Sequence, residues 1–192
     1  KGRVCNTLLN GKSIVRNTYV EHFDYSIDDI KLEDSSYVTS EMDEYFVMQV
    51  TDKKGLLRCI EIGLSNSKGK VINTYNDDNQ LVKVVNGIYG LSKDIIEVIK
   101  NEYDGELLKQ VTKSIGEDEE NQTNQFILVN TYDENKRFLL SNSITFSNTN
   151  NYSWNYTYND EHQITEVTIN GKSNNETIDT ITTKYELDAL NR

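Results

Sequence analysis

Proline is absent from the 192 residues of the chain, and cysteine, histidine and tryptophan are scarce, at two, two and one residues. Without proline, every residue can donate its backbone N–H to a β-ladder, which suits long hydrogen-bonded strands. Cys5 and Cys59 are too few for a disulfide scaffold, and their spacing leaves them paired, free or simply buried. No apolar run approaches the roughly 20 residues of a bilayer-spanning helix, so membrane insertion is not expected.

Basic residues are also few. Lys and Arg number 20 against 31 Asp and Glu, which gives the chain a net charge of −11. Such a charge repels phosphate backbones and anionic lipid surfaces. Nucleic acid is therefore not an expected partner.

Motifs for catalysis are missing as well. The sequence contains no glycine-rich phosphate loop and no nucleophile elbow, so we expect no cofactor and no enzyme activity. His22 stands between Glu21 and Asp24, which suggests acid–base chemistry, but an exposed strand residue is the favoured interpretation. Neither His22 nor His162 has a second His or Cys at ligand spacing, so no metal site is predicted. Carboxylate pairs contributed by different strands keep a hydrolase open as a weaker hypothesis.

What the sequence does contain is a repeat. Six times an anchor residue is followed by a polar turn and then by a pair of apolar residues, as in Thr51, residues 52–55, Leu57 and Ile60. The anchors are separated by 24, 28, 29, 26 and 29 residues and are Thr51, Tyr75, Tyr103, Tyr132, Tyr158 and Leu187. The four-residue turns are 52–55, 76–79, 133–136 and 159–162, and Asp104-Gly105 is a shorter turn after Tyr103. A fixed period of this size is typical of stacked supersecondary units that cannot bury their own apolar faces alone.

The period predicts an all-β protein of tandem antiparallel hairpins that form one extended curved sheet. Residues 45–192 are interpreted as the hairpin repeats, and residues 1–44 as diverged N-terminal hairpins or a cap. Each strand is expected to be about 10 residues long, because about 27 residues per repeat must supply two strands and two turns. The apolar pair is three residues apart, an odd step that predicts either two partly buried faces or a β-bulge between its members.

Residues 92–116 also allow a helix, because apolar residues recur there every four positions between Ser92 and Gly116. The hairpin is favoured, since a glycine in the middle of a helix costs about 1 kcal/mol whereas Asp-Gly is a preferred hairpin turn.

Aromatic residues gather in one segment. Residues 153–158 alternate aromatic with small polar residues, which places Trp154, Tyr156 and Tyr158 on one face of a strand. Together with Tyr152 they could stack on sugar rings, and packing between adjacent hairpins explains the alternation equally well.

The last residues carry a resemblance. Lys184-Tyr185-Glu186-Leu187-Asp188-Ala189-Leu190-Asn191-Arg192 resembles the repeat signature of the Rhs family, also called YD-repeat proteins, which reads Tyr-x-Tyr-Asp-x-x-Gly-Arg-Leu and often ends in Ala-Leu-Asn-Arg. Tyr156-Thr157-Tyr158-Asn159 and Thr131-Tyr132-Asp133 are similar to its opening. The residues that we assign to the repeat structure are Gly55, Tyr75, Tyr103, Asp104, Gly105, Tyr132, Asp133, Tyr185 and Asp188.

The resemblance implies β-hairpins wound into a hollow shell that often encloses a toxic domain in secreted or cell-surface proteins. We therefore expect a non-catalytic structural segment of a larger secreted or cell-surface bacterial protein. Its expected partners are other repeats of the same polypeptide or an enclosed toxin or effector domain. The alternative is a carbohydrate-binding module that holds glycans on exposed aromatic residues.

Overall fold

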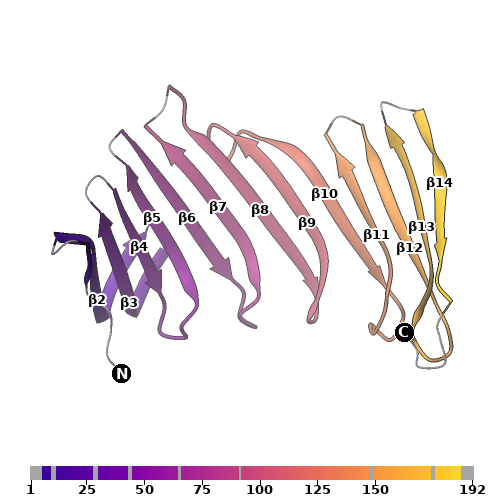
Figure 1. The fold of residues 1–192 in the computed structure, drawn as a ribbon, viewed down its shortest axis with the longest axis horizontal. Coiled ribbons are helices and arrows are strands. Elements are labelled where there is room, and N and C mark those ends of the chain that lie inside the picture. Colours follow the sequence, from indigo (N-terminus) through magenta and orange to yellow (C-terminus); the bar gives the residue numbers. More distant parts are fainter. Residues whose placement is uncertain are drawn as a thin grey trace. The chain divides into compact units, whose positions relative to one another are not determined.

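The computed structural model describes residues 6–9, 12–27, 30–42, 45–64, 66–90, 92–147, 149–173 and 176–186, and none of these residues is in a helix. Fourteen strands follow one another in the order of the chain (Figure 1). Their bounds are β1 Asn6–Leu9, β2 Lys12–Ile27, β3 Ile30–Met42, β4 Tyr45–Thr51, β5 Leu57–Leu64, β6 Ser67–Tyr75, β7 Leu81–Tyr89, β8 Ile95–Asp104, β9 Leu107–Gly116, β10 Gln122–Tyr132, β11 Leu139–Phe146, β12 Asn151–Tyr158, β13 Ile164–Ser173 and β14 Glu176–Lys184.

The all-β fold with antiparallel hairpins is confirmed. Consecutive strands pair antiparallel from β1 to β7 and again from β10 to β14. The helical alternative for residues 92–116 is wrong, because β8 and β9 occupy this segment and Gly105 lies between them with φ +63°. A glycine with positive φ at the first position of a two-residue loop is typical of a type II′ hairpin turn. The curvature of the sheet stays a prediction.

The chain divides into two compact units. Unit 1 comprises Lys1–Val98 and Ile115–Gln122, and unit 2 comprises Ile99–Ser114 and Thr123–Arg192.

Unit 1 holds a buried core. Its buried apolar side chains, each at most 8% exposed, are Leu32, Val50, Cys59, Ile72, Val85, Ile96 and Val98. The complete burial of Cys59 agrees with a core role, and Cys5 lies outside the described residues. The register places Val50, Cys59, Ile72 and Val85 in one row across β4 to β7.

The end of the β2–β3 hairpin covers this row. Leu32 belongs to β3 but lies beyond the part of that strand that pairs with β4, and it packs into the core. On β2, the Tyr25 hydroxyl reaches across to Glu61 Oε1 of β5 at 3.1 Å. Register shifts flank His22 and lie beside Asp34, both of which have positive φ, at 58° and 50°. Such bulges bend a strand pair, and here they accompany the approach of the hairpin end to the sheet face.

Unit 2 also consists of antiparallel strands, but its described residues include no buried apolar core. All seven buried apolar side chains of the described residues belong to unit 1. On β12 and β13 of unit 2 the side chains are half-buried or exposed, and on β14 nearly all are exposed. Unit 2 therefore depends on its ladders and on contacts between neighbouring side chains of the sheet surface.

The four predicted polar turns share one geometry. Gly55, Asn79, Lys136 and His162 occupy the same turn position, and all have positive φ, from 56° to 80°. In each turn the N–H of this residue donates to the carbonyl of the turn's first residue at 2.8 to 3.0 Å. This pattern corresponds to a type I turn followed by a residue in the left-handed region. Turn geometry therefore accounts for the position of His162.

A side chain of the first turn residue completes each turn. Asp52 Oδ1 accepts from the N–H groups of Lys54 and Leu56 at 2.9 and 3.0 Å. Asn159 Oδ1 accepts in the same way from Glu161 and Gln163 at 3.0 and 2.9 Å. The recurrence of Asp or Asn after the anchor thus has a local cause, since only a short side chain with an oxygen acceptor reaches these N–H groups.

A β-bulge follows each of these turns and accounts for the odd spacing of the apolar pair. Thr51 pairs with Leu57 and Val50 pairs with Cys59, which leaves Arg58 as the extra residue. Equivalent register shifts follow Tyr75, Tyr132 and Tyr158. The interpretation of a bulge between the members of the pair is confirmed.

One repeat departs from the expected spacing. Tyr132 pairs with Leu139, seven residues later, whereas Tyr75 pairs with Leu81 and Tyr158 with Ile164, six residues later. The sequence places Phe138 six residues after its anchor, like Leu57 and Leu81, and so predicts that the three are equivalent. This prediction is wrong, because the turn before Leu139 contains one additional residue.

Candidate functional site

The anchor tyrosines tie each hairpin to the hairpin before it. The Tyr75 hydroxyl donates to the carbonyl oxygen of Leu57 at 3.1 Å, and the Tyr132 hydroxyl donates to that of Leu108 at 2.9 Å. The Tyr158 hydroxyl donates to the carbonyl of Leu139 at 2.8 Å. Three of the four anchor tyrosines, Tyr75, Tyr132 and Tyr158, thus have equivalent placements. Tyr103 is half-buried on β8.

Two asparagines support the anchors. Asn73 Nδ2 donates to the same Leu57 carbonyl at 3.0 Å, and Asn130 Nδ2 donates to the Leu108 carbonyl at 2.9 Å. The ladder between β5 and β6 ends at the pair Cys59 and Ile72, so these side chains continue the hydrogen bonding where the bulge diverts the backbone. The pattern Asn-x-Tyr in residues 73–75, 101–103 and 130–132 is the sequence signal for these contacts, and the spacing of the anchors alone does not reveal it.

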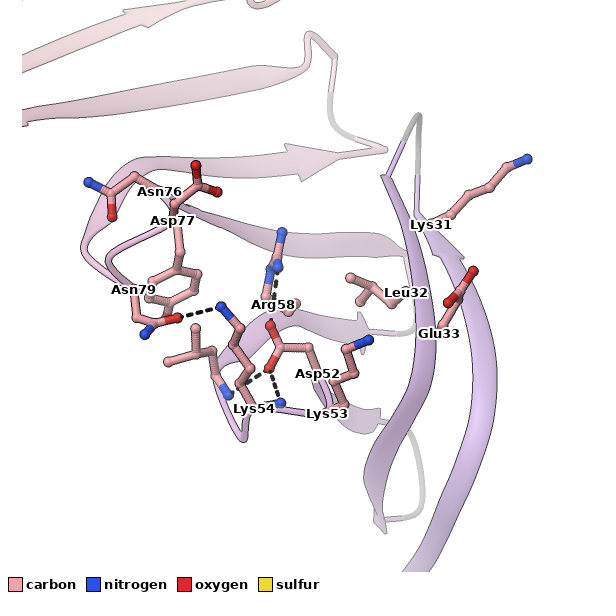
Figure 2. A pocket seen from close by; sticks show the side chains of 12 residues that line it. Lys31, Leu32, Glu33, Asp52, Lys53, Lys54, Arg58, Asn76, Asp77 and Asn79 are labelled. Carbon is pink, nitrogen blue, oxygen red and sulfur yellow. Dashed lines mark hydrogen bonds and ion pairs between the residues drawn. The ribbon is translucent and has the colours of Figure 1, made fainter.

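A cavity of about 330 Å³ lies beside the first of these anchors (Figure 2). Lys31, Leu32 and Glu33 of β3 form one side, and the turns at residues 52–55 and 76–79 form the other. Its charged residues have both signs, as Asp52 and Lys31 illustrate.

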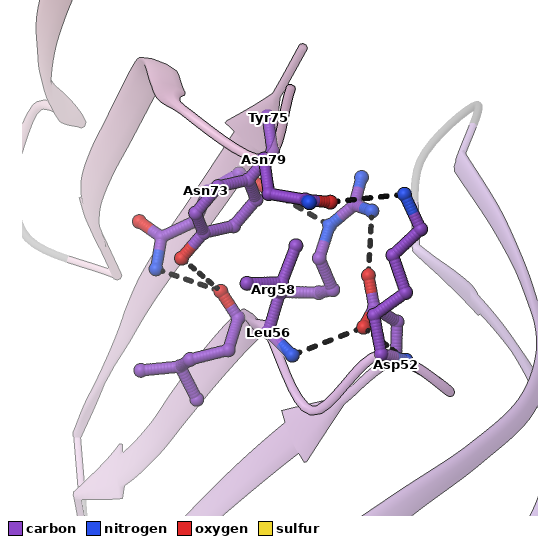
Figure 3. Close-up of polar contacts among 8 residues, drawn as sticks. Asp52, Leu56, Arg58, Asn73, Tyr75 and Asn79 are labelled. Carbon is purple, nitrogen blue, oxygen red and sulfur yellow. Dashed lines mark hydrogen bonds and ion pairs between the residues drawn. The ribbon is translucent and has the colours of Figure 1, made fainter. Parts of the chain in front are cut away.

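Arg58 is the central side chain of this cavity, and its polar atoms are already engaged (Figure 3). Its guanidinium donates to Asp52 Oδ2 and to the carbonyl of Asn73, both at 3.2 Å, and lies 5.7 Å from the ring centroid of Tyr75. Lys54 Nζ donates to Asn79 Oδ1 of the neighbouring turn at 2.9 Å. These contacts hold two successive turns together, so the cavity is structural in character.

The second candidate is one face of unit 2, on which the predicted aromatic residues lie. Directly opposed residues of antiparallel strands share a face. The pairing therefore assigns the following positions of β10 to β14 to one side, called here the apolar face of unit 2: Phe126, Leu128, Asn130, Tyr132, Leu139, Asn142, Ile144, Phe146, Tyr152, Trp154, Tyr156, Tyr158, Ile164, Val167, Ile169, Gly171, Ile178, Ile181 and Thr183.

None of these positions carries a charge, although 27% of the chain's residues are charged. The first charge on this side comes with the next pair toward the end of the β13–β14 ladder, Ser173 and Glu176. The opposite side of β11 and β12 is also uncharged but polar, with Ser141, Ser143, Asn155 and Thr157 among its residues. Contiguous apolar surface of this kind marks an interaction surface in soluble proteins. The face measures about 19 Å across five strands, taking about 4.8 Å between neighbours.

The aromatic rings of this face pack against one another. Phe126 contacts Phe146 at a centroid distance of 6.2 Å, Phe146 contacts Tyr152 at 6.4 Å, and Tyr152 contacts Trp154 at 6.4 Å. The planes are inclined by 62°, 79° and 41°, which gives mainly edge-to-face contacts. Rings in this arrangement stabilise one another.

The remaining aromatic residues of the cluster have structural partners. Tyr156 donates its hydroxyl to Asn142 Oδ1 at 3.4 Å, and the ring of Tyr158 lies 5.3 Å from that of Phe138. Burial raises the pKa of the Tyr158 phenol above its ordinary value, with further contributions from Tyr156 and the charge of Asp133. The structure thus brings all four predicted aromatic residues to one face and half-buries each of them.

The other predicted residues lie in turns and strand ends. Asp104 ends β8 and is paired with Lys136 Nζ, and Gly105 follows it. Tyr185 is 48% exposed, and its N–H donates to the carbonyl of Thr165 at 2.9 Å. Asp188 lies outside the described residues. His22 is an exposed residue of β2, as predicted, and its Nδ1 lies 2.6 Å from Asp34 Oδ1.

Asp133 is a turn carboxylate that accepts three backbone hydrogen bonds. Its side chain accepts from the N–H groups of Phe138, Arg137 and Asn135 at 2.7, 2.6 and 3.2 Å. These bonds, that from Phe138 first, hold the pKa of Asp133 below its ordinary value of 3.8. Its role is local, since it closes the turn.

Within the described ranges, no group of three or more His, Cys, Asp and Glu side chains is arranged to hold a metal ion. The same ranges contain no helix that is long and apolar enough to cross a membrane. No family model matches the chain, and no curated protein matches it. The resemblance to YD-repeat proteins therefore depends on the quoted residues alone.

Proposed function

We propose that the chain is a non-catalytic structural β-repeat segment of a larger secreted or cell-surface protein, in which its hairpins form part of a wall that encloses or presents a toxin or effector domain. The uncharged apolar face of unit 2 supports this proposal most directly. A face of five strands without a charge is costly to leave in water, and its side chains are only half-buried by one another. A further protein surface would complete their burial.

The anchors supply the second support. A wall must extend by addition of like elements, and each Tyr hydroxyl joins its hairpin to a backbone carbonyl of the hairpin before it. A backbone carbonyl is present whatever the side chain, so this contact does not depend on the sequence of the neighbour. Stability is then a sum of terms between nearest neighbours, as in other repeat proteins.

Photo-cross-linking from β14 tests the proposal. Ile181 belongs to the apolar face and is 56% exposed, whereas Thr182 is exposed on the opposite side of the same strand. With a benzoyl-phenylalanine residue at position 181 in the polypeptide as its gene encodes it, we expect cross-links to another domain of that polypeptide or to a cargo protein. The same reagent at position 182 is the matched control. Equal cross-linking from both positions, or none from position 181, would contradict the proposal.

The carbohydrate-binding alternative predicts a different result at Trp154. Exposed rings that hold a glycan would change the fluorescence of Trp154 on addition of oligosaccharides, and rings engaged in edge-to-face packing would not. The inclined ring planes favour the second outcome.

A further inference from the structure

A cavity of about 280 Å³ lies on unit 1 across β2, β3 and β4. Six of the eight described residues that line it form two rows across these strands. The rows are Tyr19 with Val38 and Gln49, and Glu21 with Ser36 and Thr51. Between them runs the row that ends in Val50, so the cavity lies on the side of the sheet opposite to the buried core.

The cavity coincides with a short anchor residue. At three other anchors, a tyrosine extends over the strand before it and donates to a backbone carbonyl, as Tyr75 does to Leu57. Thr51 holds the anchor position on β4 but is too short to cover β3 in this way. Ser36 and Val38 of β3 are small, so an open space remains above them.

The polar atoms of the cavity are mainly hydrogen-bond acceptors. The hydroxyl oxygens of Ser36 and Thr51 are 2.7 Å apart, and Thr51 also donates to the Ser36 carbonyl at 3.3 Å. With the Thr51 proton used in this way, the Ser36 hydroxyl donates to Thr51, and lone pairs of both oxygens remain. Glu21 is exposed and adds a carboxylate, which is the only charged group among the described residues that line the cavity.

An ammonium group complements these acceptors, because it has a positive charge, three hydrogen-bond donors and no acceptor. One carboxylate matches one such group, whereas an ion such as Ca²⁺ takes six to eight oxygen ligands. The net charge of the chain, −11, attracts cations. The chemistry of the cavity therefore favours a single organic ammonium group.

The second row of the cavity suits an alkyl stem. The two rows are about 6.7 Å apart, since they are separated by two residues along each strand. The four-carbon stem of a lysine covers a distance of this order. With its ammonium group at Glu21, the stem would lie over Val38 and beside Tyr19, which is 37% exposed. A tyrosine ring in this place attracts the cation and packs against the stem.

We propose that this cavity binds the side chain of a lysine on the surface of a partner protein, with the ammonium group between Glu21 and the hydroxyls of Ser36 and Thr51. A polyamine fits less well, because its next ammonium group would lie over Val38. The inference goes beyond the wall proposed above and does not depend on it, since the cavity uses no residue of the apolar face of unit 2.

Amide chemical shifts of the whole chain, followed during titration, test the proposal. The probe is Nα-acetyl-lysine methylamide, and the norleucine analogue keeps the four-carbon stem without the ammonium group. We expect the lysine probe to bind in the millimolar range, with shifts at Ser36, Val38 and Gln49. The norleucine analogue should bind about fivefold more weakly.

Substitutions at Glu21 and Thr51 separate charge from space. Glu21→Gln is expected to lower the affinity for the lysine probe about fivefold, to that for norleucine. Glu176→Gln removes the same charge from an exposed position of β14 in unit 2 and should leave the affinity unchanged. Thr51→Tyr restores the anchor tyrosine and should abolish binding of both probes, whereas Thr51→Ser should retain it. Unchanged amide shifts at Cys59 in each variant show that unit 1 remains folded.

Several results would overturn the inference. They are no shifts at the cavity with the lysine probe at tens of millimolar, equal affinities of the Glu21→Gln and Glu176→Gln variants, and full binding by Thr51→Tyr. Tighter binding of cadaverine than of the lysine probe at the same amides would also overturn it, because the cavity would then recognise a free diamine.

Discussion

Units 1 and 2 use the same turns, bulges and tyrosine anchors but bury their apolar residues differently. In unit 1, the end of the β2–β3 hairpin lies over the sheet, and seven apolar side chains are at most 8% exposed. In unit 2 the described residues include no buried apolar side chain, although its apolar face carries no charge. The repeat therefore specifies the strands and how they are joined, whereas a core requires a second layer that the repeat does not contain.

The largest expected effect is the loss of stability when a charge is placed among the apolar residues, and it should differ between the two units because their burial differs. Val50→Asp places an unpaired carboxylate at a position with 0% exposure and should lower the free energy of unfolding by about 4 kcal/mol or more. Val167→Asp, on the half-buried apolar face of unit 2, should cost only about 1 to 2 kcal/mol. Urea unfolding followed by far-ultraviolet circular dichroism measures both. Equal losses would show that the apolar face of unit 2 is as well buried as the core of unit 1.

Opposite substitutions at the left-handed turn position should change the stability of the two units with opposite sign. Gly55 in unit 1 has φ +80° and no atom near its missing Cβ, so Gly55→Ala should cost about 1 to 2 kcal/mol through backbone strain alone. Lys136 in unit 2 has φ +56°, and Lys136→Gly should gain up to about 1 kcal/mol, less the small contribution of its exposed pairing with Asp104. Thermal unfolding of both variants tests this, and a loss in Lys136→Gly would contradict the shared geometry.

The anchors are expected to differ in how much stability is lost when the tyrosine hydroxyl is removed, because some carbonyls have a second donor. The Leu57 and Leu108 carbonyls each accept from a tyrosine and an asparagine, whereas Tyr158 alone reaches the Leu139 carbonyl among the contacts described. Tyr158→Phe should therefore cost about 1 kcal/mol and Tyr132→Phe about half of that.

A double-mutant cycle checks this explanation. Asn130→Ala combined with Tyr132→Phe should cost more than the sum of the single changes, because the Leu108 carbonyl then has neither donor. Additive losses would show that the two donors act independently.

The smallest effect is the pH dependence of one turn in unit 2. The pKa of Asp133 is lowered by its backbone hydrogen bonds, so its contribution is complete above the ordinary value of 3.8 and is lost as the pH falls through the lowered value. Asp133→Asn keeps an oxygen acceptor and removes the titration. Denaturant midpoints between neutral pH and pH 3 should converge for the two proteins at the acid end, and parallel curves would contradict the assignment.

The sequence predicted most of what is local. The turns that contain Gly55 and His162, the β8–β9 hairpin around Gly105 and the bulge after four of the anchors follow from turn chemistry and from strand periodicity. These features depend on neighbours within a few residues, so their signal is contiguous in the sequence.

Features that depend on distant neighbours were missed. The approach of Leu32 to the core requires two bulges and a sheet face that forms from later strands. The extra residue before Leu139 shifts the register by one, which a fixed spacing does not reveal. The approach of the Phe46 ring to Gly63 was also not anticipated, because cross-strand pairs become visible only once the register is known.

The use of backbone carbonyls as acceptors for the tyrosines allows the gene to change both in sequence and in the number of repeats. Because Leu57, Leu108 and Leu139 take part through their main chain, almost any residue can replace them without loss of the contact. After duplication or deletion of a hairpin, the anchor tyrosine of the next hairpin would still find a backbone carbonyl on its new neighbour. Unequal recombination can therefore lengthen or shorten a protein of this kind by one repeat at a time. The side chains on the sheet surface between these tyrosine contacts can meanwhile change without loss of the contacts.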